Sequence, residues 1–294
     1  MKKQKLIIIV GPTSSGKTSL SIAVAKRFNG EVISADSRQV YRGMDLGSGK
    51  VTVEEMDDIP HHLLDIADPK DVYTADQFRV DATGAIEDIT SRGKVPVIAG
   101  GTFFYIDVLL GKISTPQVSP NEALREELEG KDTMELFKIL KEKDPRRAET
   151  IDQYNKVRLI RALEIVDALG SVPKEIKETP YDTLTIGIDV PKEELHHNIH
   201  VRLLERIEQG MIEEVARLHE EGVSWERLED LGLEYRYVAQ YLQEEISKEE
   251  MLRILESEIR KFAKRQMTWL KRDKEIRWFK KGDPQILKEI QKFL

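Results

Sequence analysis

The first third of the chain alternates short apolar runs with segments in which apolar residues recur every three or four positions. The apolar runs cover residues 5–10, 31–34 and 94–99 and are rich in Val and Ile, which is typical of buried parallel strands. A helix is predicted to begin near Lys17, between the first two strands. A second helix is predicted over residues 74–92, before the third strand. This alternation predicts an α/β fold in which helices cover a parallel sheet.

The strand pattern disappears after about residue 114, and signals for helix starts replace it. A capping residue is followed by a first-turn proline or by a glutamate three positions later in residues 119–122, 132–135 and 144–145. In the first of these signals, Ser119 is the expected N-cap. A longer helix is predicted over residues 156–169, ended by Gly170. These patterns predict an all-helical insertion.

A strand pattern returns at residues 183–190, where we expect the chain to rejoin the parent sheet. The remainder is predicted to be helical, with one helical region over residues 192–221 that breaks at Gly210. A later helix follows Ser247 and its capping partner Glu250. The predicted organisation is therefore a core domain, residues 1–114 and 183–294, which carries a helical insertion domain, residues 115–182.

Composition limits the classes of function. A net charge of -7 argues against a wholly basic nucleic-acid-binding protein, so any polyanion site is expected to be a local patch. The absence of cysteine excludes disulfides and thiolate metal sites and fits a reducing cytoplasm, where we expect the protein. The first apolar run is too short for a membrane span, so no membrane association is expected. No feature requires more than a monomer.

The strongest chemical signal is a glycine-rich loop between the first predicted strand and the first predicted helix. It matches the pattern G-x-x-x-x-G-K-[ST] and consists of Gly11, Pro12, Thr13, Ser14, Ser15, Gly16, Lys17 and Thr18. The backbone N–H groups of such a loop cradle phosphate oxygens, Lys17 adds a positive charge, and Thr18 can ligate Mg²⁺. The loop does not specify which phosphate compound it binds, because a nucleotide and any other diphosphate present the same groups.

The third predicted strand ends without the acidic residue that nucleoside triphosphatases use to organise their metal. Residues 97–102 read Val-Ile-Ala-Gly-Gly-Thr. This weakens the interpretation of the loop as part of an ordinary nucleotide-hydrolysing enzyme.

A polar segment follows the second predicted strand, at the edge of the sheet where α/β proteins bind ligands. Asp36 is placed to act as a general base there, and capping of a turn is an equally good explanation for it. Gln39 could read a purine edge, and Ser37 or Arg38 could hold sugar or phosphate.

Six segments along nearly the whole chain resemble, in order, those of the tRNA dimethylallyltransferase family. They are residues 11–18, Asp-Ser-Arg-Gln-Val-Tyr at 36–41, Pro-His-His-Leu-Leu-Asp at 60–65, Gly-Gly-Thr at 100–102, Arg-Leu-Ile-Arg-Ala-Leu-Glu at 158–164 and Lys-Arg-Gln-Met-Thr-Trp at 264–269. The resemblance implies a P-loop NTPase-like core, similar to nucleotide kinases, with a helical insertion. It also implies transfer of a dimethylallyl group from its diphosphate to the N6 amine of adenosine 37, on the 3′ side of the anticodon of tRNA.

The resemblance further implies roles for individual residues. The glycine-rich loop would hold the donor diphosphate with Mg²⁺, Arg202 would contact the same diphosphate, Asp36 would be the base, and Thr102 would contact the adenosine. The residues that would contact the tRNA anticodon stem-loop are Asp36, Ser37, Arg38, Gln39, Thr102, Val157, Arg158, Leu159, Ile160 and Arg161. Lys264 and Arg265, in a basic C-terminal segment, would supply a landing surface for the RNA backbone.

The chain departs from the family pattern at three positions. Glu234 stands where many members have glycine, Asn198 where a second arginine is frequent, and Phe262 where tyrosine is common. Three alternative functions remain open from the sequence: a small-molecule P-loop kinase, an isopentenyltransferase acting on free adenylate, and an RNA-binding protein without catalysis.

Overall fold

The computed structural model of the protein describes residues 3–116, 118–173 and 179–294. It comprises two compact units, Met1–Leu110 with Thr179–Leu294, and Gly111–Glu178. The sequence placed the ends of the insertion at residues 115 and 182, so the smaller unit begins and ends a few residues earlier. At its end, the difference arises because the next strand already starts at Tyr181.

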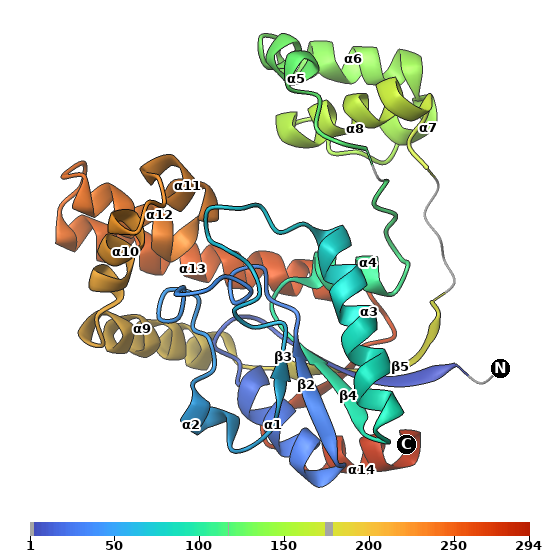
Figure 1. Ribbon diagram of the computed structural model, residues 1–294, viewed down its shortest axis with the longest axis vertical. Helices are drawn as coiled ribbons and strands as arrows, with labels where there is room; N and C mark the ends of the chain where they lie inside the picture. The colour runs from blue at the N-terminus through green and yellow to red at the C-terminus, as the bar shows by residue number, and fades with distance from the viewer. Residues whose placement is uncertain (1–2, 117, 174–178) are drawn as a thin grey trace. The chain divides into compact units, whose positions relative to one another are not determined.

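The larger unit is built on a six-stranded sheet in the order β3-β2-β4-β1-β5-β6, in which all neighbouring strands are parallel (Figure 1). The strands are β1 (Gln4–Val10), β2 (Gly30–Ser34), β3 (His61–His62), β4 (Val95–Ala99), β5 (Tyr181–Asp189) and β6 (Arg277–Lys280). The predicted parallel α/β fold is confirmed, and β1, β2, β4 and β5 correspond to the four predicted strands. Strands β3 and β6 were not predicted, because both are short and neither contains an apolar run.

Helices cover both faces of the sheet. On one face, α1 (Lys17–Arg27) and α14 (Gln285–Phe293) pack against alternate residues of the strands, such as Ile7 and Ile9. The intervening strand residues, such as Ile8, point to the opposite face. There α3 (Ala75–Ser91) contacts β2 and β4 through an apolar stripe that includes Phe78 and Ile86. The sheet is therefore buried on both sides, as parallel sheets are.

A second core of the larger unit lies among helices that follow the sheet. These are α9 (Lys192–Glu208), α10 (Met211–Glu220), α11 (Trp225–Leu231), α12 (Leu233–Leu242) and α13 (Lys248–Leu270). The predicted break at Gly210 separates α9 from α10, and the predicted capping box of Ser247 and Glu250 starts α13. Two short helices complete this unit, α2 (Val53–Met56) and α4 (Phe103–Leu109).

The described residues of the smaller unit form helices and the loops that join them. It contains α5 (Glu122–Glu129), α6 (Thr133–Lys143), α7 (Pro145–Ala148) and α8 (Lys156–Leu169). The predicted starts at Asp132 and Asp144 are confirmed, as is the end of α8 at Gly170. The expectation that Ser119 caps the first helix was wrong. The N-cap is Asn121, whose side chain accepts a hydrogen bond from the backbone N–H of Leu124.

No helix in the described part of the chain combines the length and the apolar character that a membrane crossing requires.

Candidate active site

A cavity of about 930 Å³ opens in the larger unit. It is lined by the glycine-rich loop after β1, by the segments that follow β2 and β4, and by residues of α9, α12 and α13. Because β1, β2 and β4 are parallel, their carboxyl ends meet at one edge of the sheet, where open α/β folds bind ligands. The four residues predicted to be catalytic, Lys17, Asp36, Thr102 and Arg202, all line this cavity.

The glycine-rich loop wraps into the first turn of α1. Gly16 has a left-handed backbone, φ 90°, which lets the chain turn into the helix at the position of its N-cap. Lys17 Nζ donates a hydrogen bond to the carbonyl of Pro12 at 2.8 Å. The hydroxyl of Ser15 is buried and has no hydrogen-bond partner among the described residues. A loop of backbone donors with an unused buried hydroxyl is suited to an anionic ligand.

The ammonium group of Lys17 is partly desolvated. Burial lowers its pKa to about 8, although the nearby charge of Asp36 raises it and that of Arg202 lowers it further. An anion that enters the cavity stabilises the charge of a lysine in this state more than that of an exposed lysine, because the anion compensates for the lost hydration.

The geometry of Asp36 fits both explanations that the sequence left open. Its Oδ1 accepts hydrogen bonds from the backbone N–H groups of Arg38 at 2.9 Å and Gln39 at 3.4 Å, so this oxygen caps the turn after β2. Its Oδ2 accepts no hydrogen bond from the described residues. A Cβ on Gly101 would lie 3.4 Å from Oδ2, so glycine at that position leaves room beside the carboxylate. One oxygen therefore fixes the carboxylate and the other is open to the cavity.

The neighbouring polar side chains are largely held by the protein itself. The Ser37 N–H donates to Thr102 Oγ1 at 2.9 Å, which joins the segment after β2 to the segment after β4. The amide of Gln39 accepts from Ser34 Oγ at 3.0 Å and donates to the Gly49 carbonyl at 3.2 Å. Arg38 donates through Nε to the Leu231 carbonyl. In this state, both polar atoms of the Gln39 amide already have one hydrogen-bond partner within the protein.

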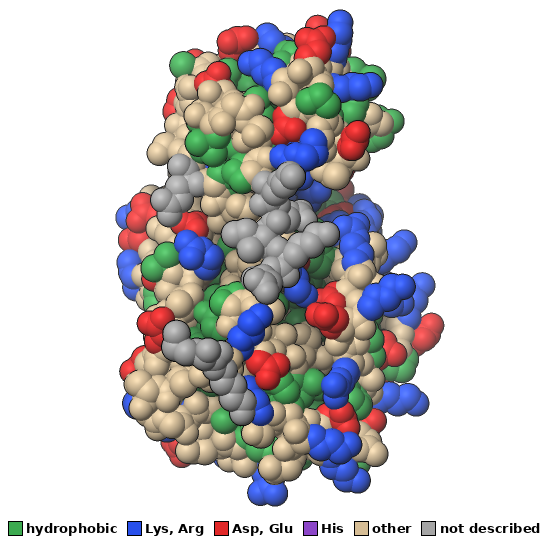
Figure 2. Space-filling view, turned by 90° about the vertical axis from the view of Figure 1, so that its right-hand side faces the viewer, with side chains coloured by type: hydrophobic (Ala, Val, Ile, Leu, Met, Phe, Trp, Pro, Cys, Tyr) green, Lys and Arg blue, Asp and Glu red, His purple; other side chains and the backbone are tan. Residues whose placement is uncertain are grey.

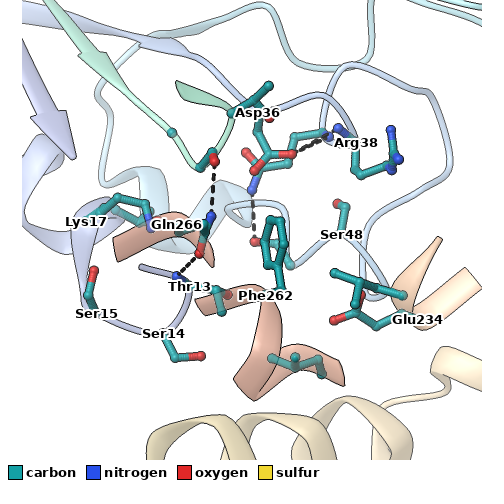
Figure 3. Close-up of a pocket in the computed structure, with 18 of the residues that line it drawn as sticks. Thr13, Ser14, Ser15, Lys17, Asp36, Arg38, Ser48, Glu234, Phe262 and Gln266 are labelled. Carbon is teal, nitrogen blue, oxygen red and sulfur yellow. Dashed lines mark hydrogen bonds between the residues drawn. The ribbon is translucent and has the colours of Figure 1, made fainter. Parts of the chain in front are cut away.

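Gln266 lines the cavity, and apart from its place in the segment 264–269 no sequence pattern singled it out. Its side chain is buried and bridges the two halves of the site: Oε1 accepts from the Thr13 N–H at 2.8 Å, and Nε2 donates to the Gly101 carbonyl at 3.0 Å (Figure 3). The amide of Gln266 thus fixes the glycine-rich loop relative to the loop that carries Thr102.

One face of α9 lines the cavity with polar side chains. Asn198, Arg202 and Arg206 recur every four residues, so they lie on the same side of the helix. Asn198 Nδ2 reaches the Ser14 carbonyl at 3.5 Å, and Arg206 bonds to Glu234 Oε1 at 3.3 Å. Burial lowers the pKa of Arg202 to about 10. The neighbouring charge of Arg206 lowers this pKa further, and nearby glutamates raise it.

The predicted tRNA-contacting residues of the smaller unit differ in exposure. Val157 and Arg158 are exposed on α8, and Arg161 is partly exposed but bonds to Glu164 and to the Val118 carbonyl. Leu159 and Ile160 are buried in the core of this unit. Their side chains face inward because α8 packs on α6, and contact of this segment with tRNA stays a prediction.

Lys264 and Arg265 are both exposed on α13, and Arg265 also lines the cavity, with its guanidinium 5.9 Å from the centre of the Phe262 ring. The two histidines after Pro60 have partners within the protein: His62 Nε2 pairs with Glu31 at 2.7 Å, and His61 Nδ1 lies 2.8 Å from the Ile59 carbonyl. Within the described residues, no group of three or more His, Cys, Asp or Glu side chains is arranged to hold a metal ion.

Known proteins resemble this chain in sequence and in structure. Residues 39–273 match the family described as IPP transferase. A curated relative, tRNA dimethylallyltransferase 2 of Treponema denticola, is 46% identical over 92% of each chain. A crystal structure of tRNA delta(2)-isopentenylpyrophosphate transferase from Staphylococcus epidermidis is 38% identical, with a TM-score of 0.73 over 99% of this chain and 98% of that one.

A eukaryotic dimethylallyltransferase, solved acting on tRNA, is 28% identical, with a TM-score of 0.82 over 95% of this chain and 74% of that one. These likenesses in sequence and in structure extend over nearly the whole chain, and they confirm the expected P-loop NTPase-like fold. The chain belongs to the IPP transferase family.

Proposed function

We propose that this protein transfers a dimethylallyl group from dimethylallyl diphosphate to the N6 amine of adenosine 37 in tRNA. The observation that carries the proposal is that one cavity contains both a phosphate-binding loop and a carboxylate with a free oxygen (Figure 3). The relatives named tRNA dimethylallyltransferase support the choice of substrates.

The donor would bind with its diphosphate in the glycine-rich loop. Lys17 and Arg202 would stabilise the negative charge that grows on the diphosphate as the carbon–oxygen bond breaks. Thr18 is exposed, lines the cavity and begins α1 with Lys17, so its hydroxyl could hold Mg²⁺ beside the diphosphate. When bound, Mg²⁺ would neutralise part of the charge of the leaving group. In this role, the loop holds a leaving group and does not transfer a phosphoryl group.

The acceptor amine would approach from the side of Asp36. An adenine amine is a weak nucleophile because its lone pair is conjugated with the ring, so attack needs a base that removes a proton as the carbon–nitrogen bond forms. Asp36 Oδ2 would take that proton, while Oδ1 keeps its bonds to the turn. The products are prenylated adenosine, inorganic diphosphate and a protonated Asp36, which returns its proton to solvent.

The alternatives fit less well. A kinase would be expected to carry an acidic residue at the end of β4, where this chain has Gly100, Gly101 and Thr102. An enzyme for free adenylate would not need the helical insertion or the exposed cations of α13. A silent RNA-binding protein would not need a carboxylate held with one oxygen free.

The exposed cations of α13 would contact the tRNA backbone. On the face shown in Figure 2, acidic and basic side chains are interspersed over the larger unit, so RNA binding requires a local group of unpaired cations. Lys264 and Arg265 have no acidic partner among the described residues. On the same helix, Lys261 is paired with Glu258 at 2.6 Å.

Affinity for tRNA falls as salt rises, and a plot of log affinity against log salt has a negative slope. We therefore expect Lys264→Ala and Arg265→Ala each to make this slope shallower by about one. The slope is measured by titrating labelled tRNA at several salt concentrations. Lys261→Ala is the matched control and should change the slope less, because Glu258 already neutralises its charge. Equal slopes for all four proteins would remove Lys264 and Arg265 from the proposed RNA surface.

The proposed activity is tested by incubating the purified protein with unmodified tRNA, Mg²⁺ and dimethylallyl diphosphate, followed by mass spectrometry of the digested nucleosides. The expected result is N6-dimethylallyladenosine at position 37. Rapid ATP turnover without any prenylated nucleoside would favour the kinase. Prenylation of free adenylate but not of tRNA would favour the adenylate enzyme.

A further inference from the structure

The cavity contains an ion pair that the proposed reaction does not use. Glu234 lines the cavity from α12, its side chain is only 12% exposed, and its Oε1 accepts a hydrogen bond from Arg206 on α9 at 3.3 Å. Burial raises the pKa of Glu234, while Arg206 lowers it. A carboxylate in this position is costly unless it compensates a nearby positive charge.

That positive charge comes from two arginines that converge on one point. The terminal nitrogen of Arg202 lies 3.3 Å from the position that a Cβ on Gly49 would occupy, and the guanidinium of Arg206 lies closer still. Gly49 has φ 61° and no side chain, which allows both guanidinium groups to pack against its backbone. Two like charges this close repel each other, and this repulsion adds to burial in lowering the pKa of Arg202.

The two arginines differ in what holds them. Arg206 is bound by Glu234, whereas Arg202 forms no hydrogen bond or ion pair within residues 3–116, 118–173 and 179–294. Arg202 lies one helical turn from Arg206 and one turn from Asn198, which reaches the glycine-rich loop. Arg202 is therefore positioned to bind the diphosphate, and Arg206 is its neighbour on the side away from the loop.

We propose that Glu234 is the counter-ion of this arginine pair, and that it weakens the hold of the cavity on free inorganic diphosphate, so that this product is released. The proposal rests on the proposed function, since it takes a diphosphate to be the ligand of the cavity. Glu234 acts in two ways: it keeps Arg206 from turning toward the anion, and its own negative charge repels the anion. It is a positioning residue and takes no part in bond breaking.

The test is the affinity of the full-length protein for inorganic diphosphate with Mg²⁺, measured by calorimetry. Glu234→Gln keeps the size of the side chain and removes its charge. We expect it to tighten diphosphate binding about tenfold, the effect of removing one negative charge near the anion when salt screens part of it. Glu234→Ala should change affinity in the same direction, which provides a second variant should either fold poorly. In steady-state assays, inhibition by inorganic diphosphate should strengthen in parallel.

Glu289→Gln is the matched control, because Glu289 also pairs with an arginine, Arg277 at the start of β6, and does not line the cavity. It should leave diphosphate affinity unchanged. Unchanged or weaker binding in both Glu234 variants would overturn the proposal, and a merely structural role for Glu234 could not produce tighter binding. If instead the unaltered protein bound no diphosphate, or bound it equally well after Lys17→Ala, the proposed donor site itself would be wrong.

Discussion

Asp36→Asn is expected to slow prenyl transfer by about 10²-fold or more while tRNA affinity stays within a few-fold of the unaltered protein. The side chain of asparagine retains the oxygen that accepts hydrogen bonds from the N–H groups of Arg38 and Gln39, so the turn after β2 should keep its conformation. What is lost is the oxygen that can take a proton. The measurement is single-turnover formation of prenylated tRNA, together with tRNA binding at equilibrium.

A control is available elsewhere in the larger unit. Asp68 Oδ1 accepts a hydrogen bond at 2.9 Å from the N–H of Lys70, the residue two positions later in the chain. This is the same turn that Asp36 forms with Arg38, but Asp68 does not line the cavity. Asp68→Asn should therefore leave the rate unchanged. If Asp36→Asn lost tRNA binding and rate to the same extent, Asp36 would be a structural residue of the turn and not the base.

Lys17→Ala is expected to reduce kcat/KM for dimethylallyl diphosphate by about 10²-fold, as the loss of one charged donor to a developing anion does. The ammonium group is partly buried beside the loop, so water cannot replace it fully once the donor is bound. Lys26→Ala is the matched control, because Lys26 lies on the same helix and pairs with Asp57 outside the cavity. Unchanged donor kinetics in Lys17→Ala would reject the role of the loop as a clamp for the leaving group.

The pH dependence of donor binding gives a second measurement on the same variant. Burial lowers the pKa of Lys17 to about 8, so in the free protein its charge is present below that pH and is lost as the pH rises through it. The affinity advantage of the unaltered protein over Lys17→Ala should therefore be largest below pH 8 and should narrow above it. Comparing the two proteins removes the titration of the diphosphate itself, which both experience equally.

The parts of the site that the sequence predicted are those that local signals define. The spacing of Gly11, Gly16 and Lys17, between an apolar run and a helical pattern, predicts a phosphate-binding loop without knowledge of the fold. Asp36 was placed at the right edge of the sheet because it follows a predicted strand. The capping boxes at Asp132 and Ser247 were equally visible, since each depends on residues only three positions apart.

What the sequence could not predict depends on contacts between distant segments. Gln266 lies far from Thr13 and Gly101 in the chain, and no local pattern indicates that its amide joins them. The pairing of Glu234 with Arg206 is hidden in the same way, although the departure of Glu234 from the family pattern was a usable signal. Strand β6 forms because it can pair with β5, so its own sequence does not identify it.

Helix α13 contributes both to the packing of the larger unit and to the geometry of the cavity. Its buried positions, Met251, Leu255, Ile259, Ala263, Gln266 and Leu270, form one continuous stripe. The apolar members fill the interior, and the single amide among them holds the glycine-rich loop. A small loss of packing anywhere along this stripe would rotate or shift the amide, so substitutions of buried aliphatic residues far from the ligands can reduce catalysis in molecules that remain folded.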